Sequence, residues 1–151
     1  MFRVNRQTDY AIRVVLALAK QPPGTRLSSA DIGKEMLIPA AFLSRIVAQL
    51  AQAQVVQTFP GRDGGLQLAR PPEEISLREI VDLMEGPLLL SECMLGEQAC
   101  PFEHRCPVRT RWQRLQAVIL EELEKTKFSH LAQEANAIHS NPLLATIISQ
   151  S

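Results

Sequence analysis

Aromatic residues are scarce in this chain, which has five Phe, one Tyr and one Trp among 151 residues. Because 46% of the residues are hydrophobic, the chain can still bury the core of one compact domain, and that core must be mainly aliphatic. No apolar run approaches the length of a membrane span, and the first residues lack the pattern of a secretion signal. We therefore expect a cytoplasmic location, where thiols stay reduced.

The sequence signals of an enzyme are also missing. The chain has no glycine-rich cofactor loop, no nucleophile elbow and no acid–base pair near its cysteines. His130 and His139 have no companion ligand nearby, so we interpret them as surface or packing residues. We therefore expect a binding or regulatory protein rather than a catalyst.

A net charge of zero hides a strong asymmetry between the two halves. Residues 1–70 contain nine Lys or Arg and four Asp or Glu, an excess of five positive charges. Residues 71–151 contain seven basic and twelve acidic residues, an excess of five negative charges. A basic half of this kind indicates contact with a polyanion, whereas the acidic half suggests a different role.

The basic half has the pattern of a winged helix-turn-helix. Helical periodicity predicts helices over 8–20, 28–36 and 38–53, with Pro39 in the first turn of the third helix. The strand-like segments 55–59 and 66–69 flank "GRDGG", which predicts a β-hairpin. The third helix should bury a stripe made of Phe42, Leu43, Ile46, Val47 and Leu50.

The sequence pattern of the second half predicts helices on both sides of a loop that contains all the cysteines. A helix over 75–86 precedes the loop, and a long helix over 108–126 and a short helix over 128–135 follow it. We thus expect a mainly α fold with a small β-hairpin wing, divided into a winged helix-turn-helix region (1–86), a cysteine loop (87–107), a dimerisation helix with a short terminal helix (108–135) and a tail (136–151). The apolar residues of the long helix recur at roughly heptad spacing, which suggests a dimer contact through Trp112, Leu115, Val118, Ile119 and Leu123.

A winged helix-turn-helix places its recognition helix in the major groove of DNA and its wing on the phosphate backbone or minor groove. Arg45 can read guanine, and Arg62 offers a positive charge on the wing. A protein-docking module is the alternative, but the basic bias favours double-stranded DNA. The predicted DNA contacts are Arg3, Arg6, Ser28, Ala40, Ala41, Ser44, Arg45, Gln49, Arg62 and Gly64.

The three cysteines lie in "ECMLGEQACPFEHRCP", with six residues between Cys93 and Cys100 and five between Cys100 and Cys106. These gaps are too long for paired CxxC zinc arms, whereas thiolates on an irregular loop can surround an iron–sulfur cluster. A proline follows two of the cysteines, as it does in a ferredoxin ligand run. Three metal-free thiols and a zinc site that adds His104 stay open as alternatives. A cluster would need a fourth ligand, for which the candidates are Asp9, His104, Glu103 and Glu92.

Taken together, these features resemble the iron–sulfur winged-helix regulators of the Rrf2 superfamily, which includes IscR, NsrR and RirA. The resemblance runs from the N-terminus to about Ala132 and rests on "QTDYAIRVVLALA", "IPAAFLSRIVAQLAQAQVV", "GRDGGLQLARPPEEISLREIVDLMEG" and the cysteine loop. It implies a homodimer that crosses at the long helix, with a 4Fe–4S or 2Fe–2S cluster on Cys93, Cys100 and Cys106. It also implies a transcriptional regulator, usually a repressor, that responds to nitric oxide, oxidants or the supply of iron and clusters.

The N-terminal motif is most similar to the nitric-oxide-sensing NsrR branch. In that branch an aspartate early in the first helix binds the partner subunit's cluster, and "TDY" places Asp9 at this position. The IscR branch uses a histidine shortly after the third cysteine, which this chain does not have. Two departures stand out: Pro60 replaces the arginine that usually opens the wing, and the first cysteine gap does not select a subfamily.

Overall fold

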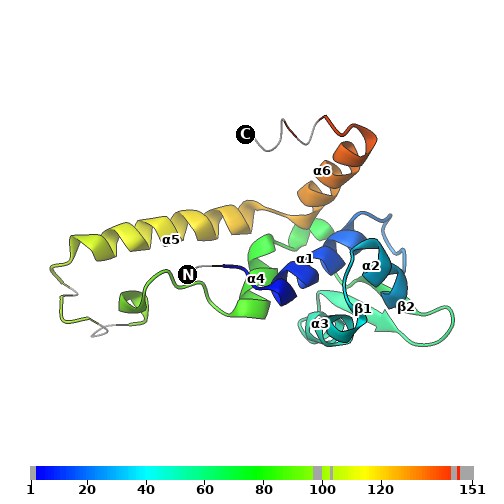
Figure 1. Ribbon diagram of the computed structural model, residues 1–151, viewed down its shortest axis with the longest axis horizontal. Helices are drawn as coiled ribbons and strands as arrows, with labels where there is room; N and C mark the ends of the chain where they lie inside the picture. The colour runs from blue at the N-terminus through cyan, green and yellow to red at the C-terminus, as the bar shows by residue number, and fades with distance from the viewer. Residues whose placement is uncertain (1–2, 97–99, 103, 144–145, 147–151) are drawn as a thin grey trace.

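The computed structural model describes residues 3–96, 100–102, 104–143 and 146. Within these residues a lobe of helices carries a β-hairpin on one side, while one long helix extends away from the lobe (Figure 1). The elements are α1 (Arg6–Ala19), α2 (Ser29–Glu35), α3 (Ala40–Gln52), β1 (Val56–Phe59), β2 (Gly65–Leu68), α4 (Leu77–Glu85), α5 (Pro107–Lys125) and α6 (Phe128–Ser140), with short 3-10 turns at Pro72–Glu74 and Glu92–Met94.

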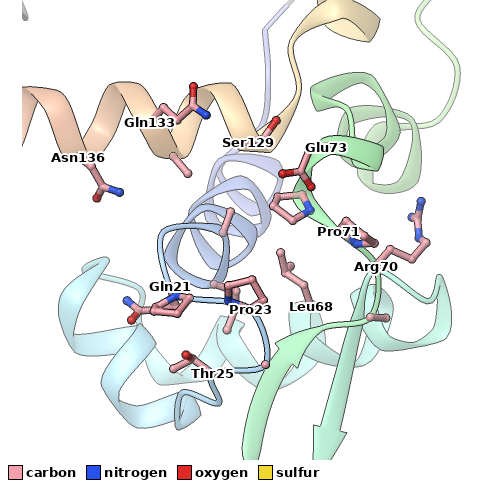
Figure 2. Close-up of a pocket in the computed structure, with 17 residues that line it drawn as sticks. Gln21, Pro23, Thr25, Leu68, Arg70, Pro71, Glu73, Ser129, Gln133 and Asn136 are labelled. Carbon is pink, nitrogen blue, oxygen red and sulfur yellow. The ribbon is translucent and has the colours of Figure 1, made fainter.

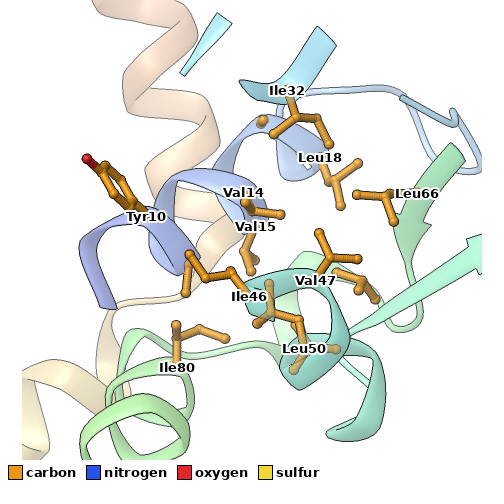
Figure 3. Packing of buried hydrophobic residues seen from close by; sticks show 14 of the residues in the cluster. Tyr10, Val14, Val15, Leu18, Ile32, Ile46, Val47, Leu50, Leu66 and Ile80 are labelled. Atoms are coloured by element: carbon orange, nitrogen blue, oxygen red, sulfur yellow. The ribbon is translucent and has the colours of Figure 1, made fainter. Parts of the chain in front are cut away.

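Helix α1 forms the centre of the lobe. It begins after Asn5, whose side-chain oxygen accepts a hydrogen bond from the Thr8 backbone N–H at 2.9 Å and so caps the helix. Its apolar residues recur at helical spacing and pack against α3, α4 and α6. Figure 3 shows Val14, Val15 and Leu18 of α1 facing residues of the other elements in an aliphatic core, as the composition predicted.

The helix-turn-helix forms where it was predicted. The Ser28 hydroxyl caps α2 by accepting a hydrogen bond from the Asp31 backbone N–H at 3.0 Å. Pro39 is the N-cap residue of α3 rather than part of its first turn. Four of the five residues predicted for the buried stripe are buried, but Phe42 is 36% exposed. Its ring lies at the edge of the stripe and tilts against the Tyr10 ring, with 5.5 Å between the centroids.

Strands β1 and β2 form an antiparallel hairpin in which Val56 pairs with Leu68 and Phe59 with Gly65. Each strand starts or ends within one residue of its predicted bounds. The hairpin is attached to the segment before α2 by an additional bridge between Leu27 and Leu66. The predicted fold class, a mainly α chain with a small wing, is therefore confirmed.

Helix α6, which the sequence analysis grouped with the predicted dimerisation helix, packs against the lobe. It extends to Ser140, beyond the predicted 128–135, and packs against α1. Phe128, in its first turn, is completely buried in the core. Backbone hydrogen bonds from Leu77 N to Thr126 O (2.8 Å) and from Phe128 N to Ile75 O (3.0 Å) fasten this corner to the start of α4.

A pocket of about 540 Å³ lies where the end of α1, the end of β2 and α6 meet (Figure 2). Polar side chains from different elements line it, among them Gln21, Arg70 and Gln133. None of the residues predicted to bind DNA, metal or a partner subunit lines this pocket. Among the described residues, no helix is long and apolar enough to cross a membrane.

Candidate nucleic-acid interface and cysteine segment

One face of α3 is exposed and carries most of the predicted reading residues. Ala40, Ala41, Ser44 and Arg45 are exposed, while the opposite side of the helix enters the core. Gln49 differs from its predicted position on this face, because it is half-buried and its Oε1 atom is buried without a hydrogen-bond partner among the described residues. The predicted reading residues that are exposed therefore all lie in the first two turns of α3.

The wing places Arg62 at an exposed turn between the two strands. Gly64 is required at its position, because a Cβ atom there would collide with the Phe59 carbonyl. Ser28, a predicted DNA contact, uses its hydroxyl to cap α2 and to donate a hydrogen bond to the Asp31 carboxylate at 2.7 Å. The capping of α2 thus accounts for the presence of a serine at position 28 without any contact with DNA.

Arg26 contacts the wing and is absent from the predicted set. Its guanidinium carbon lies 3.6 Å from the centroid of the Phe59 ring, and its Nη1 donates a hydrogen bond to the Asp63 carbonyl at 3.4 Å. No periodicity or motif in the sequence signals this contact, because the residues come from separate elements. Only the basic character of the first half pointed to an additional cation here.

The two N-terminal arginines, Arg3 and Arg6, are both exposed. Arg3 lines a pocket of about 380 Å³ together with Val81, Glu85 and residues 86–90, and no residue of α3 or of the wing lines it. Arg3 is therefore next to the start of the cysteine segment, which we define as residues 87–107. Arg6 is the first residue of α1.

Asp9, the preferred fourth cluster ligand, lies in the first turn of α1 and is engaged within its own chain. Its Oδ2 is 2.7 Å from Nη2 of Arg13, one turn further along the helix. Nη1 of Arg13 donates a hydrogen bond to the carbonyl of Met36 at 3.1 Å, at the C-terminal end of α2. The Asp9 carboxylate is thus linked by one side chain to the turn of the helix-turn-helix.

The first turn of α1 is also held by the end of α4. The Thr8 hydroxyl and the Asn5 backbone N–H donate hydrogen bonds to the same Oε1 of Glu85, at 2.6 and 2.7 Å. These two hydrogen bonds lower the pKa of Glu85 below its ordinary value, and the one from Thr8 has the larger effect. Because the cysteine segment begins two residues after Glu85, this carboxylate connects the start of that segment to α1.

The cysteine segment carries three free, partly exposed thiols. Cys93 lies in the 3-10 turn Glu92–Met94, where its sulfur is 3.1 Å from the Ser91 hydroxyl oxygen. Cys106 is the N-cap residue of α5, so the positive end of the helix dipole lies beside it. Cys100 follows residues 97–99, which, like the candidate ligand Glu103, lie outside the described residues.

The donor chemistry of this segment suits an iron–sulfur cluster, because it combines three thiols that form no disulfide. Its geometry does not assemble the site, since the described residues include no group of three or more His, Cys, Asp or Glu side chains able to hold a metal ion. The other candidate ligands Glu92 and His104 are exposed. In a single copy of the chain, the thiols are thus available but not gathered.

Helix α5 has no buried residue, although it carries apolar side chains along one face. Val118 is 62% exposed, Leu115 46% and Trp112 39%, while Ile119 and Leu123 are partly buried. Apolar groups at such spacing on a projecting helix are typical of a helix that packs against another copy. The predicted dimer contact through α5 stays a prediction that this exposure favours.

Comparison with known proteins identifies the family. The family model described as "Rrf2: Iron-dependent Transcriptional regulator" matches residues 4–134. A putative HTH-type transcriptional regulator of Mycobacterium tuberculosis is 31% identical over 139 residues, which cover 91% of this chain and 85% of the relative. The HTH-type transcriptional regulator NsrR of Shouchella clausii is 32% identical over 119 residues, which cover 78% of this chain and 80% of NsrR.

Solved structures share the fold. CymR, described as the global cysteine regulator of B. subtilis, superposes with a TM-score of 0.75 at 25% identity, over 88% of this chain and 98% of CymR. IscR of T. potens superposes with a TM-score of 0.71 over 89% of this chain and 88% of IscR, and its identity of 21% supports the fold alone. The family model spans most of the chain, and the alignments with relatives above 30% identity span most of this chain and most of each relative. The chain therefore belongs to the Rrf2 family of transcriptional regulators.

Proposed function

We propose that this regulator is a homodimeric repressor that binds double-stranded DNA, and that an iron–sulfur cluster on Cys93, Cys100 and Cys106 controls its DNA affinity. The observation that carries the proposal is that every cysteine, free and partly exposed, lies in the one segment between the end of α4 and the start of α5. The iron-dependent description of the family and the NsrR relatives support a cluster of the 4Fe–4S or 2Fe–2S type.

When bound, such a cluster would supply a group that reacts with nitric oxide or oxidants and that depends on iron supply. Three thiols leave one iron site open, and we propose that Asp9 of one subunit fills this site for the partner's cysteines. Asp9 is about half exposed, so its carboxylate is accessible to a second subunit. Binding there would take Asp9 from Arg13, whose other donor holds the Met36 carbonyl. The helix-turn-helix would thereby respond to the state of the cysteine segment.

The regulation then follows from linkage between two sites. The DNA affinities of the loaded and cluster-free dimers must differ, and couplings of about 1–3 kcal/mol would change the affinity for the operator by roughly 5- to 150-fold. The likeness to NsrR favours nitric oxide as the signal, with other redox stress or iron and cluster supply as alternatives.

Anaerobic purification tests the proposal directly. The protein should be coloured and contain iron and sulfide. Titration with nitric oxide should bleach the visible absorbance, and DNA retention should change at the same ratio of nitric oxide to protein. A variant with all three cysteines replaced by alanine is the control, and it should bind no iron. Colourless, iron-poor protein that retains DNA with unchanged affinity would refute the cluster.

A second candidate is a metal-free or zinc-bound regulator in which the thiols themselves respond. It is favoured because the described residues gather no metal site and because CymR, described as a cysteine regulator, shares the fold. In that case iron-free protein would change its DNA affinity on treatment with a thiol oxidant and recover it with a reductant. Zinc analysis of colourless protein separates the two forms of this candidate.

A further inference from the structure

The wing is fastened to the segment that leads into α2. The backbone N–H of Leu27 donates to the Leu66 carbonyl at 2.9 Å, and that of Leu66 donates to the Leu27 carbonyl at 2.7 Å. Gly65 makes this approach possible, because it has a φ of +131° and a Cβ atom there would lie 2.7 Å from the Leu27 carbonyl oxygen. The hairpin therefore approaches the helix-turn-helix along one strand edge.

Arg26, next to that bridge, holds the other strand and the turn. Its guanidinium carbon lies 3.6 Å from the centre of the Phe59 ring, at the end of β1, and its Nη1 reaches the Asp63 carbonyl. These two contacts lie on either side of the exposed Arg62. One side chain thus spans both ends of the segment that carries the wing's cation.

We propose that Arg26 is a positioning residue that fixes the orientation of the wing relative to α3 before DNA is bound. A two-stranded hairpin is at best marginally stable by itself. A wing that was not attached would therefore become ordered only when DNA binds, and the entropy lost in that ordering would weaken DNA binding. A cation stacked on an aromatic ring reduces that cost without any contact between the ring and DNA. The proposal rests on the DNA binding that membership of this regulator family implies.

The competing explanation is that the exposed Arg26 simply contacts a phosphate. The two explanations differ in the dependence of affinity on salt, because each phosphate contact contributes about 0.9 to the slope of log K against log salt. Phe59 separates them most cleanly, since its ring carries no charge. Replacing this ring should change affinity only if the contact with Arg26 positions the wing.

The experiment uses full-length protein in one cofactor state and the tightest duplex that the wild-type protein selects from a randomised DNA pool. Phe59→Leu should bind about 2- to 5-fold more weakly, the factor expected for an exposed cation–π contact, with an unchanged salt slope. Phe59→Trp should retain the affinity, because it keeps an aromatic face. Arg26→Gln should have less effect in the Phe59→Leu background than in the wild type. Equal affinity of Phe59→Leu and wild type, or strictly additive effects, would overturn the proposal.

A measurement without DNA provides a second test. Amide hydrogen exchange of residues 59–66 in the free protein should become faster in Phe59→Leu and in Arg26→Gln, while the melting temperature of the lobe stays close to that of the wild type. Arg62→Gln is the matched control, because it removes a charge from the same turn and should lower the salt slope without changing this exchange. Unchanged exchange in both Phe59→Leu and Arg26→Gln would show that Arg26 does not hold the wing.

Discussion

Replacing Asp9 with alanine should separate the stability of the fold from the stability of the cofactor. The carboxylate and its partner Arg13 are 48% and 39% exposed, and an exposed pair at i,i+4 contributes about 0.3–0.5 kcal/mol. Its place in the first turn of α1 adds a helix-dipole term of about 0.3–1 kcal/mol. Asp9→Ala should therefore cost about 1 kcal/mol of folding free energy, which lowers the melting temperature by roughly 2–4 °C in a chain of this size.

The effect on a bound cluster should be much larger, since a ligand would be lost. We expect anaerobically purified Asp9→Ala to lose its visible absorbance in air faster than the wild type, measured at equal protein concentration. Asp82→Ala is the matched control, because Asp82 forms a pair of the same spacing with Arg78 at similar exposure, 38% and 39%, but is no candidate ligand. Equal cluster lifetimes in Asp9→Ala and Asp82→Ala would refute the assignment of Asp9.

Four further outcomes are expected. Thr8→Val should lose about 1 kcal/mol of folding free energy at neutral pH, because its hydrogen bond to Glu85 disappears. That hydrogen bond stabilises the ionised carboxylate, so in the wild type its contribution should fade as the pH falls below the ordinary carboxyl pKa. Urea unfolding of both proteins at neutral and acidic pH checks the cost and its pH dependence. Phe128→Ala should cost about 3–5 kcal/mol in thermal unfolding, since the ring is fully buried; a cost below 1 kcal/mol would contradict its place in the core. Arg62→Ala should lower the salt slope of DNA binding by about 0.9, and an unchanged slope would remove Arg62 from the phosphate contacts. Val118→Asp should produce monomers in sedimentation with the circular dichroism of the lobe retained, whereas an intact dimer would place the interface elsewhere.

The parts of the fold that the sequence predicted are those governed by local rules. The periodicity of apolar residues located α1 and α3, because a helix that buries one face must repeat its apolar residues at that spacing. The same periodicity located α5, although its apolar side chains are exposed in the single chain. The glycine-rich turn located the wing, since its backbone approaches too closely for side chains. Errors occurred at the edges of these patterns: Phe42 and Gln49 flank the buried stripe of α3, where periodicity does not decide which side chain is covered.

The remainder depends on contacts between distant residues, for which local spacing carries no signal. Phe128 was predicted only as the first residue of a short terminal helix, and its burial in the core depends on how α5 and α4 meet. The same reason hides the contact of Arg26 with Phe59 and the hydrogen bond from Thr8 to Glu85, each made between separate elements. The three cysteines stay a predicted donor set, because the described residues do not gather three ligands around one point.

In the proposed regulation, the ends of α4 offer a route from the cysteine segment to the DNA-binding face. At its C-terminal end, Glu85 holds the first turn of α1 immediately before the cysteine segment begins. Within that segment, the backbone N–H of Leu90 donates a hydrogen bond to Gln116 Oε1 on α5 at 3.1 Å. At the N-terminal end of α4, Leu77 is hydrogen-bonded to Thr126, just beyond α5. The segment is therefore flanked by α4 and α5, and α4 is fastened both to the end of α5 and to α1. A rearrangement that gathers the thiols and moves one of these attachments would act on α1, in addition to the proposed route from Asp9 through Arg13 to the helix-turn-helix turn.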